Sequence, residues 1–169
     1  RELANAICEE TDIAKQDASA HRFEHSLETQ LPFLQYFKDK FKIVPICIKW
    51  LNLSSCKSLG EGIVRALKRI DKPVLLVASS DMTHYESHDI ATIKDRMAIT
   101  CIENRDPHGL IETVQSEKIT MCGVNPVTIM LLCCEKLGAK EAELVKYMTS
   151  GDISGDMEKV VGYAGMIIK

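Results

Sequence analysis

The sequence lacks any long hydrophobic run. No stretch approaches the roughly 20 apolar residues that a membrane-spanning helix needs, and the opening RELANAICEE is amphipathic and acidic, unlike a signal peptide. Internal repeats, low-complexity tracts and linkers are absent as well. We therefore expect a globular, cytoplasmic protein that forms a single α/β domain over residues 1–169.

A basic surface is also missing. The formal net charge is −3, and the lysines and arginines are scattered among acidic residues instead of being clustered. Proteins that bind nucleic acid usually concentrate positive charge on one face, because they must neutralise phosphates. The sequence therefore argues against nucleic acid as a partner.

No CxxC pair occurs, and the seven cysteines are an odd number. Both features argue against a disulfide framework and against the usual structural zinc motifs. Most of the cysteines lie in apolar periodic segments, which predicts reduced thiols in the core. They are Cys8, Cys47, Cys56, Cys101, Cys122, Cys133 and Cys134.

Hydrophobic residues make up 46% of the chain, enough for a substantial core. Apolar residues at three- and four-residue steps predict helices over 2–10, 25–39, 59–70, 88–104, 107–117 and 126–137. Ser26 is a candidate N-cap of the second helix, and Pro32 predicts a kink or break within it. Gly138 suits the C-cap of the last.

Apolar, β-branched segments predict strands at 41–50, 72–80, 142–149 and 160–168. The five consecutive apolar residues 74–78 favour a central strand with both sheet faces covered, whereas Pro45 argues for an edge or irregular position. Strands that alternate with helices indicate an α/β fold, a layered sheet with flanking helices.

Polar residues follow the predicted central strand at once: Ser79, Ser80, Asp81 and then His84. In α/β sheets ligands collect at the carboxyl ends of strands, so Asp81 could orient an imidazole or bind substrate, and His84 could exchange a proton near neutral pH. Alternatively, Ser80 and Asp81 cap the next segment and His84 is a loop residue. No Gly-x-Ser-x-Gly elbow is present, which argues against a serine nucleophile.

Cys122 differs from the other cysteines because it precedes Gly123 at the approach to a predicted helix. A helix N-terminus favours the thiolate, the form that binds metal; burial in the core is the alternative. His25 either neighbours the cap of its own helix or reaches a shared site. Folding could bring Cys122, His84, His25 and Asp81 together, although their spacing does not by itself define a metal centre.

Five sequence blocks span nearly the whole chain: EHSLETQLPFLQYF, FKIVPI, VASSDMTHYES, ITMCGVNPV and YMTSGDISGDMEKVVGYAGMII. These blocks, and their order along the chain, closely resemble the Memo family, in particular its prokaryotic members, protein B of the AmmeMemoRadiSam system.

The resemblance implies a fold related to class III extradiol dioxygenases and a metal-dependent redox enzyme that uses iron or copper. Cys122 matches the family's metal-binding cysteine, His84 its acid–base position and Asp81 the companion aspartate, whereas His25 matches a pocket-lining histidine. An unknown small molecule is the implied substrate. The radical-SAM and protein A components of the system are implied partners.

The family's two metal histidines lie in blocks of the form PHAGY and GP(S/N)H, and neither block occurs in this sequence. The chain thus resembles the C-terminal portion of a Memo protein. We expect it to expose a sheet edge through which it could form a homo-oligomer. Two alternatives to an enzyme remain: a non-catalytic ligand- or protein-binding member of the system, and an inactive chain without the metal histidines.

Overall fold

Three antiparallel strands form the sheet of this protein, in the order β1-β3-β2. The computed structural model describes residues 1–169. The strands are β1 (His84–Glu86), β2 (Ala142–Thr149) and β3 (Val160–Ile168). The helices are α1 (Glu2–Glu10), α2 (Leu31–Phe37), α3 (Leu53–Lys68), α4 (His88–Glu103), α5 (Pro107–Ser116), α6 (Val124–Leu137) and α7 (Gly151–Ser154), with short 3-10 turns η1 (Ser19–His21) and η2 (Glu28–Gln30).

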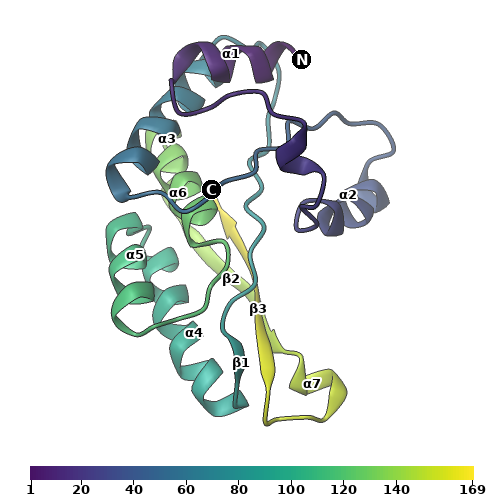
Figure 1. The fold of residues 1–169 in the computed structure, drawn as a ribbon, viewed down its shortest axis with the longest axis vertical. Coiled ribbons are helices and arrows are strands. Elements are labelled where there is room, and N and C mark those ends of the chain that lie inside the picture. Colours follow the sequence, from purple (N-terminus) through teal and green to yellow (C-terminus); the bar gives the residue numbers. More distant parts are fainter.

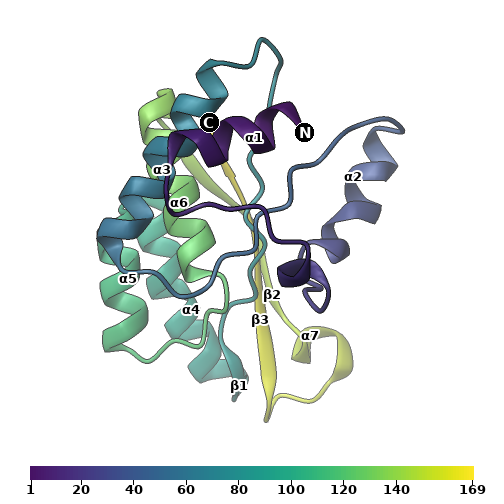
Figure 2. The same ribbon diagram turned by 45° about the horizontal axis from the view of Figure 1, so that its top comes forward.

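The helices α3, α4, α5 and α6 lie on one side of the strands, whereas α2 lies on the other side (Figures 1 and 2). α4 packs directly on β2 and β3, and α6 packs between α3 and α5. α1 crosses the top of this layer and contacts α3 (Figure 1). The fold is therefore a mixed α/β arrangement with a helical layer on one face of a small sheet.

Two apolar clusters hold the helical layer together. One joins α1, α3 and α6 around Cys56 and Ala66, and the other joins α4, α5, α6 and the inner face of the sheet around Ile99 and Leu110. These four residues are at most 1% exposed. Burying a large aliphatic side chain such as Ile99 or Leu110 stabilises a fold by about 1.5–3 kcal/mol, so the second cluster fixes the helical layer against the sheet.

Local signals set several helix ends. Asn52 caps α3 by accepting from Ser55 N–H at 2.9 Å, and Asp106 caps α5 by accepting from Gly109 N–H at 2.8 Å. α6 ends at Gly138, whose φ of 93° places it in the left-handed region, as the sequence predicts. The predictions for α1, α4, α5, α6, β2 and β3 are confirmed to within two residues.

Two strand predictions are wrong. Residues 41–50 and 72–80 have no strand pairing, so 74–78 is not the central strand of the sheet. In the first segment every second residue, Val44, Ile46 and Ile48, packs against the apolar cluster of α1, α3 and α6, as alternate residues of a strand would. A strand also needs backbone hydrogen bonds to a neighbouring strand, and neither segment makes any.

The helix predicted over 25–39 is shorter than expected. It consists of the η2 turn followed by α2, and Gln30, not Ser26, is the N-cap of α2. Pro32 lies in the first turn of α2, where its missing N–H breaks no helical hydrogen bond. The predicted break at this proline is therefore a helix start.

Apolar side chains remain exposed on the face of the sheet that α4 does not cover. Val145, Tyr163 and Ile167 are 59%, 45% and 52% exposed, and we call these three residues the open face. Leu75 and Val77, in the extended segment that leads to β1, are exposed as well. Contiguous exposed apolar surface usually marks a contact with another molecule or segment. No helix has the length and apolar character needed to cross a membrane.

The link between α1 and α3 generates a pH prediction. Glu10 bonds Arg65 at 2.9 Å and Arg69 at 3.1 Å, and these two guanidinium groups, Arg65 foremost, lower the pKa of Glu10 below its ordinary value of 4.5. A carboxylate whose pKa is lower when folded stabilises the protein above its unfolded pKa. That stabilisation is lost as the pH falls through the lower folded value.

We therefore expect Glu10→Gln to lower the melting temperature slightly at neutral pH, because exposed ion pairs are weak. The difference from the unchanged protein should shrink as the pH is lowered below 4.5. Thermal unfolding followed by circular dichroism across this range measures the difference. Glu28→Gln, at a carboxylate without an ion pair, is the control; a difference that grows toward acid pH would contradict the account.

Candidate metal centre

Three of the four site residues predicted from the sequence come together in the fold. One ligand atom from each of Asp81, His84 and Cys122 lies within 4.8 Å of the other two. Asp81 ends an extended segment, His84 begins β1, and Cys122 lies in the loop before α6. His25 is exposed and does not belong to this group.

The ring of His84 is held by the backbone of the Cys122 loop. Its Nδ1 lies 2.8 Å from the carbonyl oxygen of Thr120, and its backbone N–H donates to Thr120 Oγ1 at 2.7 Å. A carbonyl oxygen can only accept, so Nδ1 carries the proton in this contact. In the neutral ring the lone pair therefore resides on Nε2, which faces Asp81.

Asp81 presents its carboxylate to that lone pair. The distance from Asp81 Oδ2 to His84 Nε2 is 3.5 Å, and the Asp81 side chain is about half exposed. With neutral His84, two groups that offer electron pairs face each other without a proton between them. A cation between the two groups, either a proton or a metal ion, would make this contact favourable.

The thiol of Cys122 completes the group and is exposed, so burial in the core does not explain this cysteine. Its sulfur accepts a hydrogen bond from the Asp81 backbone N–H at 3.2 Å, and Ser80 Oγ lies 3.9 Å away. α6 begins two residues later, as the sequence predicts for a thiol near a helix N-terminus. Of the other cysteines only Cys56 and Cys133 are buried, so the prediction that most are core thiols is confirmed for these two alone.

Ser80 and Gly123 join the two loops that carry the site. Ser80 Oγ accepts from Gly123 N–H at 2.9 Å and donates to the Asp81 carbonyl at 2.7 Å. A Cβ at Gly123 would lie 2.4 Å from Ser80 Cβ, so a side chain there would push the loops apart. Ser80 therefore holds the Asp81 and Cys122 segments together. It does not cap a helix, because the segment that follows is β1.

His25 lies in a segment that is tied to the site without contributing to it. Ser79 Oγ donates to the carbonyl of Ser26 at 2.9 Å and accepts from Gln30 Nε2 at 3.0 Å. The residue next to His25 is thus anchored to the loop before Asp81. The pocket-lining role of His25 stays a prediction.

Two neighbours of the site gave no recognisable signal in the sequence. Thr120 acts through its backbone carbonyl and a hydroxyl that bonds backbone, and neither contact leaves a motif. Tyr163, on β3, is the second neighbour. Burial raises the pKa of its hydroxyl, and the negative charge of the nearby Asp81 carboxylate raises it further. Only the strand pairing that carries Tyr163 toward Asp81 could have revealed it.

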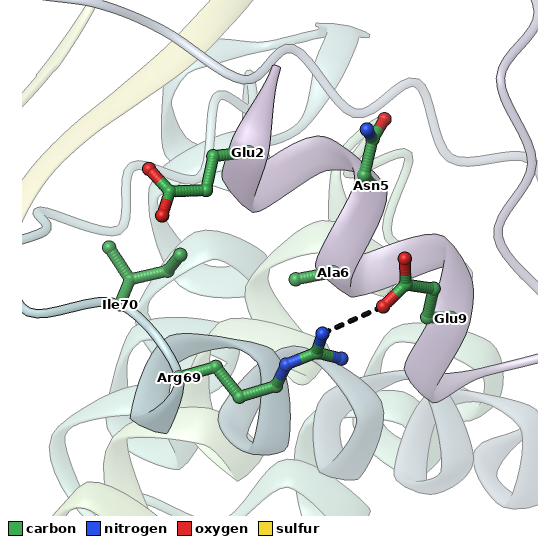
Figure 3. Close-up of a pocket in the computed structure, with 6 residues that line it drawn as sticks. All are labelled: Glu2, Asn5, Ala6, Glu9, Arg69 and Ile70. Carbon is green, nitrogen blue, oxygen red and sulfur yellow. Dashed lines mark hydrogen bonds and ion pairs between the residues drawn. The ribbon is translucent and has the colours of Figure 1, made fainter.

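A separate hollow lies between α1 and the end of α3, and none of the three clustered residues lines it (Figure 3). Its charged groups already satisfy one another, since Arg69 bonds Glu9 at 2.7 Å and Lys72 bonds Glu2 at 3.4 Å. Ala6 and Ile70 are its only apolar lining residues. The hollow therefore offers no free charge to a ligand.

Comparison with known proteins gives a consistent result. The model of the Memo-like protein family matches residues 1–167. The chain is 42% identical over 169 residues to the MEMO1 family protein of Methanopyrus kandleri, covering 99% of this chain and 60% of that protein. It is 43% identical over 166 residues to the one of Ignicoccus hospitalis, covering 98% and 58%.

The MEMO1 family protein of Methanocaldococcus jannaschii is 40% identical over 172 residues, with 99% and 60% covered. The chain therefore spans about three fifths of the length of the curated relatives that it matches.

Proposed function

The chain belongs to the Memo family, and from that premise we propose that it carries a metal centre of a metal-dependent redox enzyme, with Asp81, His84 and Cys122 as ligands. The metal would be iron or copper and the substrate a small molecule. A relation to the dioxygenase-like fold is part of the same proposal.

The convergence of three electron-pair donors supports the proposal most directly. A carboxylate oxygen, an imidazole nitrogen and a sulfur lie within 4.8 Å of one another, and the Nδ1 contact with Thr120 leaves the His84 Nε2 lone pair directed at the group. Metal-binding histidines usually donate their other ring N–H to a carbonyl or carboxylate in this way. The donors present therefore fit a transition metal.

The types of ligand also agree with such a metal. Thiolate is soft, imidazole intermediate and carboxylate hard, a mixture that suits iron, copper or zinc better than calcium or magnesium. Three protein ligands leave open positions for substrate or water, as in catalytic sites. A bound metal would supply Lewis acidity or electron transfer, and Asp81, His84 and Cys122 would hold it in place.

A second candidate function follows from the Asp81–His84 contact by itself. If the cation between Oδ2 and Nε2 is a proton, the pair at 3.5 Å is an acid–base dyad in which Asp81 orients His84. In that case Cys122 would be the metal ligand, and His84 would exchange protons with the substrate.

Metal-binding measurements on substituted chains test the site. We expect the chain to bind iron(II) or copper in equilibrium dialysis under anaerobic conditions, and Cys122→Ala to weaken binding by about 100-fold, at least as much as losing a supporting partner costs. Cys47→Ala, which removes another exposed thiol outside the group, should leave binding unchanged.

The same measurement separates the two candidates. His84→Ala should likewise weaken binding by about 100-fold if Nε2 is a ligand, and should leave the affinity for the metal unchanged if His84 is an acid–base group. A chain that binds neither metal, or whose Cys122→Ala variant binds as tightly as the unchanged chain, would contradict the proposal.

We further propose that the open face is a contact surface, with a second copy of the chain as its occupant. α4 covers one face of β2 and β3, whereas Val145, Tyr163 and Ile167 expose apolar area on the other. Removing an apolar surface of this kind from water lowers the free energy, and self-association covers the same surface on both copies.

Sedimentation velocity at increasing protein concentration tests this contact. We expect the chain to self-associate, and the double substitution Val145→Ser and Ile167→Ser to weaken association. Ile153→Ser, at a residue 82% exposed on α7, should not change it. A monomer at every concentration would refute the contact.

A further inference from the structure

A carboxylate that the proposed metal centre does not use lies directly behind it. Asp95, in α4, has no exposed surface, and both of its oxygens are engaged. Oδ1 accepts from the Thr83 backbone N–H at 2.8 Å, and Oδ2 accepts from the Tyr147 hydroxyl at 2.8 Å. None of the ion pairs in the structure includes Asp95. Burying a carboxylate without a cation is costly, so a residue of this kind calls for an explanation.

The contact with Thr83 gives the first part of the explanation. Thr83 lies between Asp81 and His84, so the backbone that Asp95 holds is the one that presents both side chains. Three successive N–H groups of this backbone bond three different elements: Met82 bonds Gly162 of β3 at 2.9 Å, Thr83 bonds α4 and His84 bonds Thr120. Asp95 thus supplies one of the three contacts that fix the segment.

Two neighbours, Gly162 and Tyr147, allow the Asp95 carboxylate to lie beside the Thr83 backbone. A Cβ at Gly162 would lie 1.9 Å from Asp95 Oδ2 and 3.2 Å from Met82 Cβ, so only glycine leaves room for the carboxylate between α4 and β3. Burial, and then the hydrogen bond to Asp95, raise the pKa of Tyr147, which keeps its hydroxyl protonated as a donor. Both donors therefore remain directed at the carboxylate.

We propose that Asp95 is a positioning residue of the metal centre: by accepting from Thr83 N–H it holds Asp81 and His84 in the orientation that faces Cys122. The inference rests on the proposed function for its metal, but the orientation of His84 can be measured without one. Asp95 touches neither ligand atom and acts only through the backbone.

Zinc(II) alone serves as the probe for the test, because it is redox-inert. Asp95→Asn keeps the size of the side chain, but it removes the charge and leaves one accepting oxygen for two donors, the Thr83 N–H and the Tyr147 hydroxyl. We expect it to weaken zinc binding by about 10- to 100-fold, the range found for residues that support metal ligands. Asp106→Asn is the matched control: that aspartate also accepts a backbone N–H, at the start of α5, so it should lower stability without changing zinc affinity.

The ring of His84 provides the second measurement. At about pH 8.5, above the ordinary histidine pKa of about 6.5, nitrogen NMR should show Nδ1 protonated in the unchanged chain and a mixture of both forms in Asp95→Asn. If the variant fails to fold, zinc added to the unchanged chain should shift the Thr83 amide and Asp95 carboxyl resonances; no shift would overturn the proposal.

The outcomes separate the two ideas. A chain that binds none of zinc, iron(II) and copper overturns the proposed function, and the protonation of the His84 ring then tests the role of Asp95 by itself. If zinc binds and depends on Cys122, but folded Asp95→Asn has the same affinity and the same ring signal, only the positioning role is overturned.

Discussion

The pairing of β1 with β3 is the constraint on which the site depends. Two short bonds, from Met82 N–H to Gly162 and from Gly162 N–H to Thr83, place the segment that carries Asp81 and His84 against the C-terminal strand. The loop before α6 then adds Cys122 through Thr120 and Gly123. Residues about forty positions apart in the sequence thereby meet, and the helical layer behind them keeps the strands in place.

Much of the fold is evident from periodicity. Apolar residues at helical spacing define α1, α4, α5 and α6, and the C-terminal strands β2 and β3 also follow from composition. The strand predictions for 41–50 and 72–80 are wrong because apolar, β-branched residues favour an extended backbone but do not show whether another strand lies beside it. β1 and α7 are too short for a periodic pattern.

The residues of the site also fall into those that the sequence indicates and those that it does not. Asp81 and His84 could be proposed because polar residues follow an apolar run, and Cys122 because it precedes a helix. Thr120 and Asp95 could not, since both act on backbone atoms of residues distant in the sequence. Side chains that bear chemistry leave a signal in the sequence, whereas the groups that orient them become visible only when the chain is folded. Glu10→Gln, far from the site, probes stability alone.

X-ray absorption at the zinc edge of the zinc-loaded chain tests the central claim most directly, because it identifies the ligand atoms. The account predicts one sulfur at about 2.3 Å together with nitrogen and oxygen neighbours, and loss of the sulfur in Cys122→Ala. A spectrum with only nitrogen and oxygen around the metal would contradict it, since Asp81, His84 and Cys122 would then not share one ion.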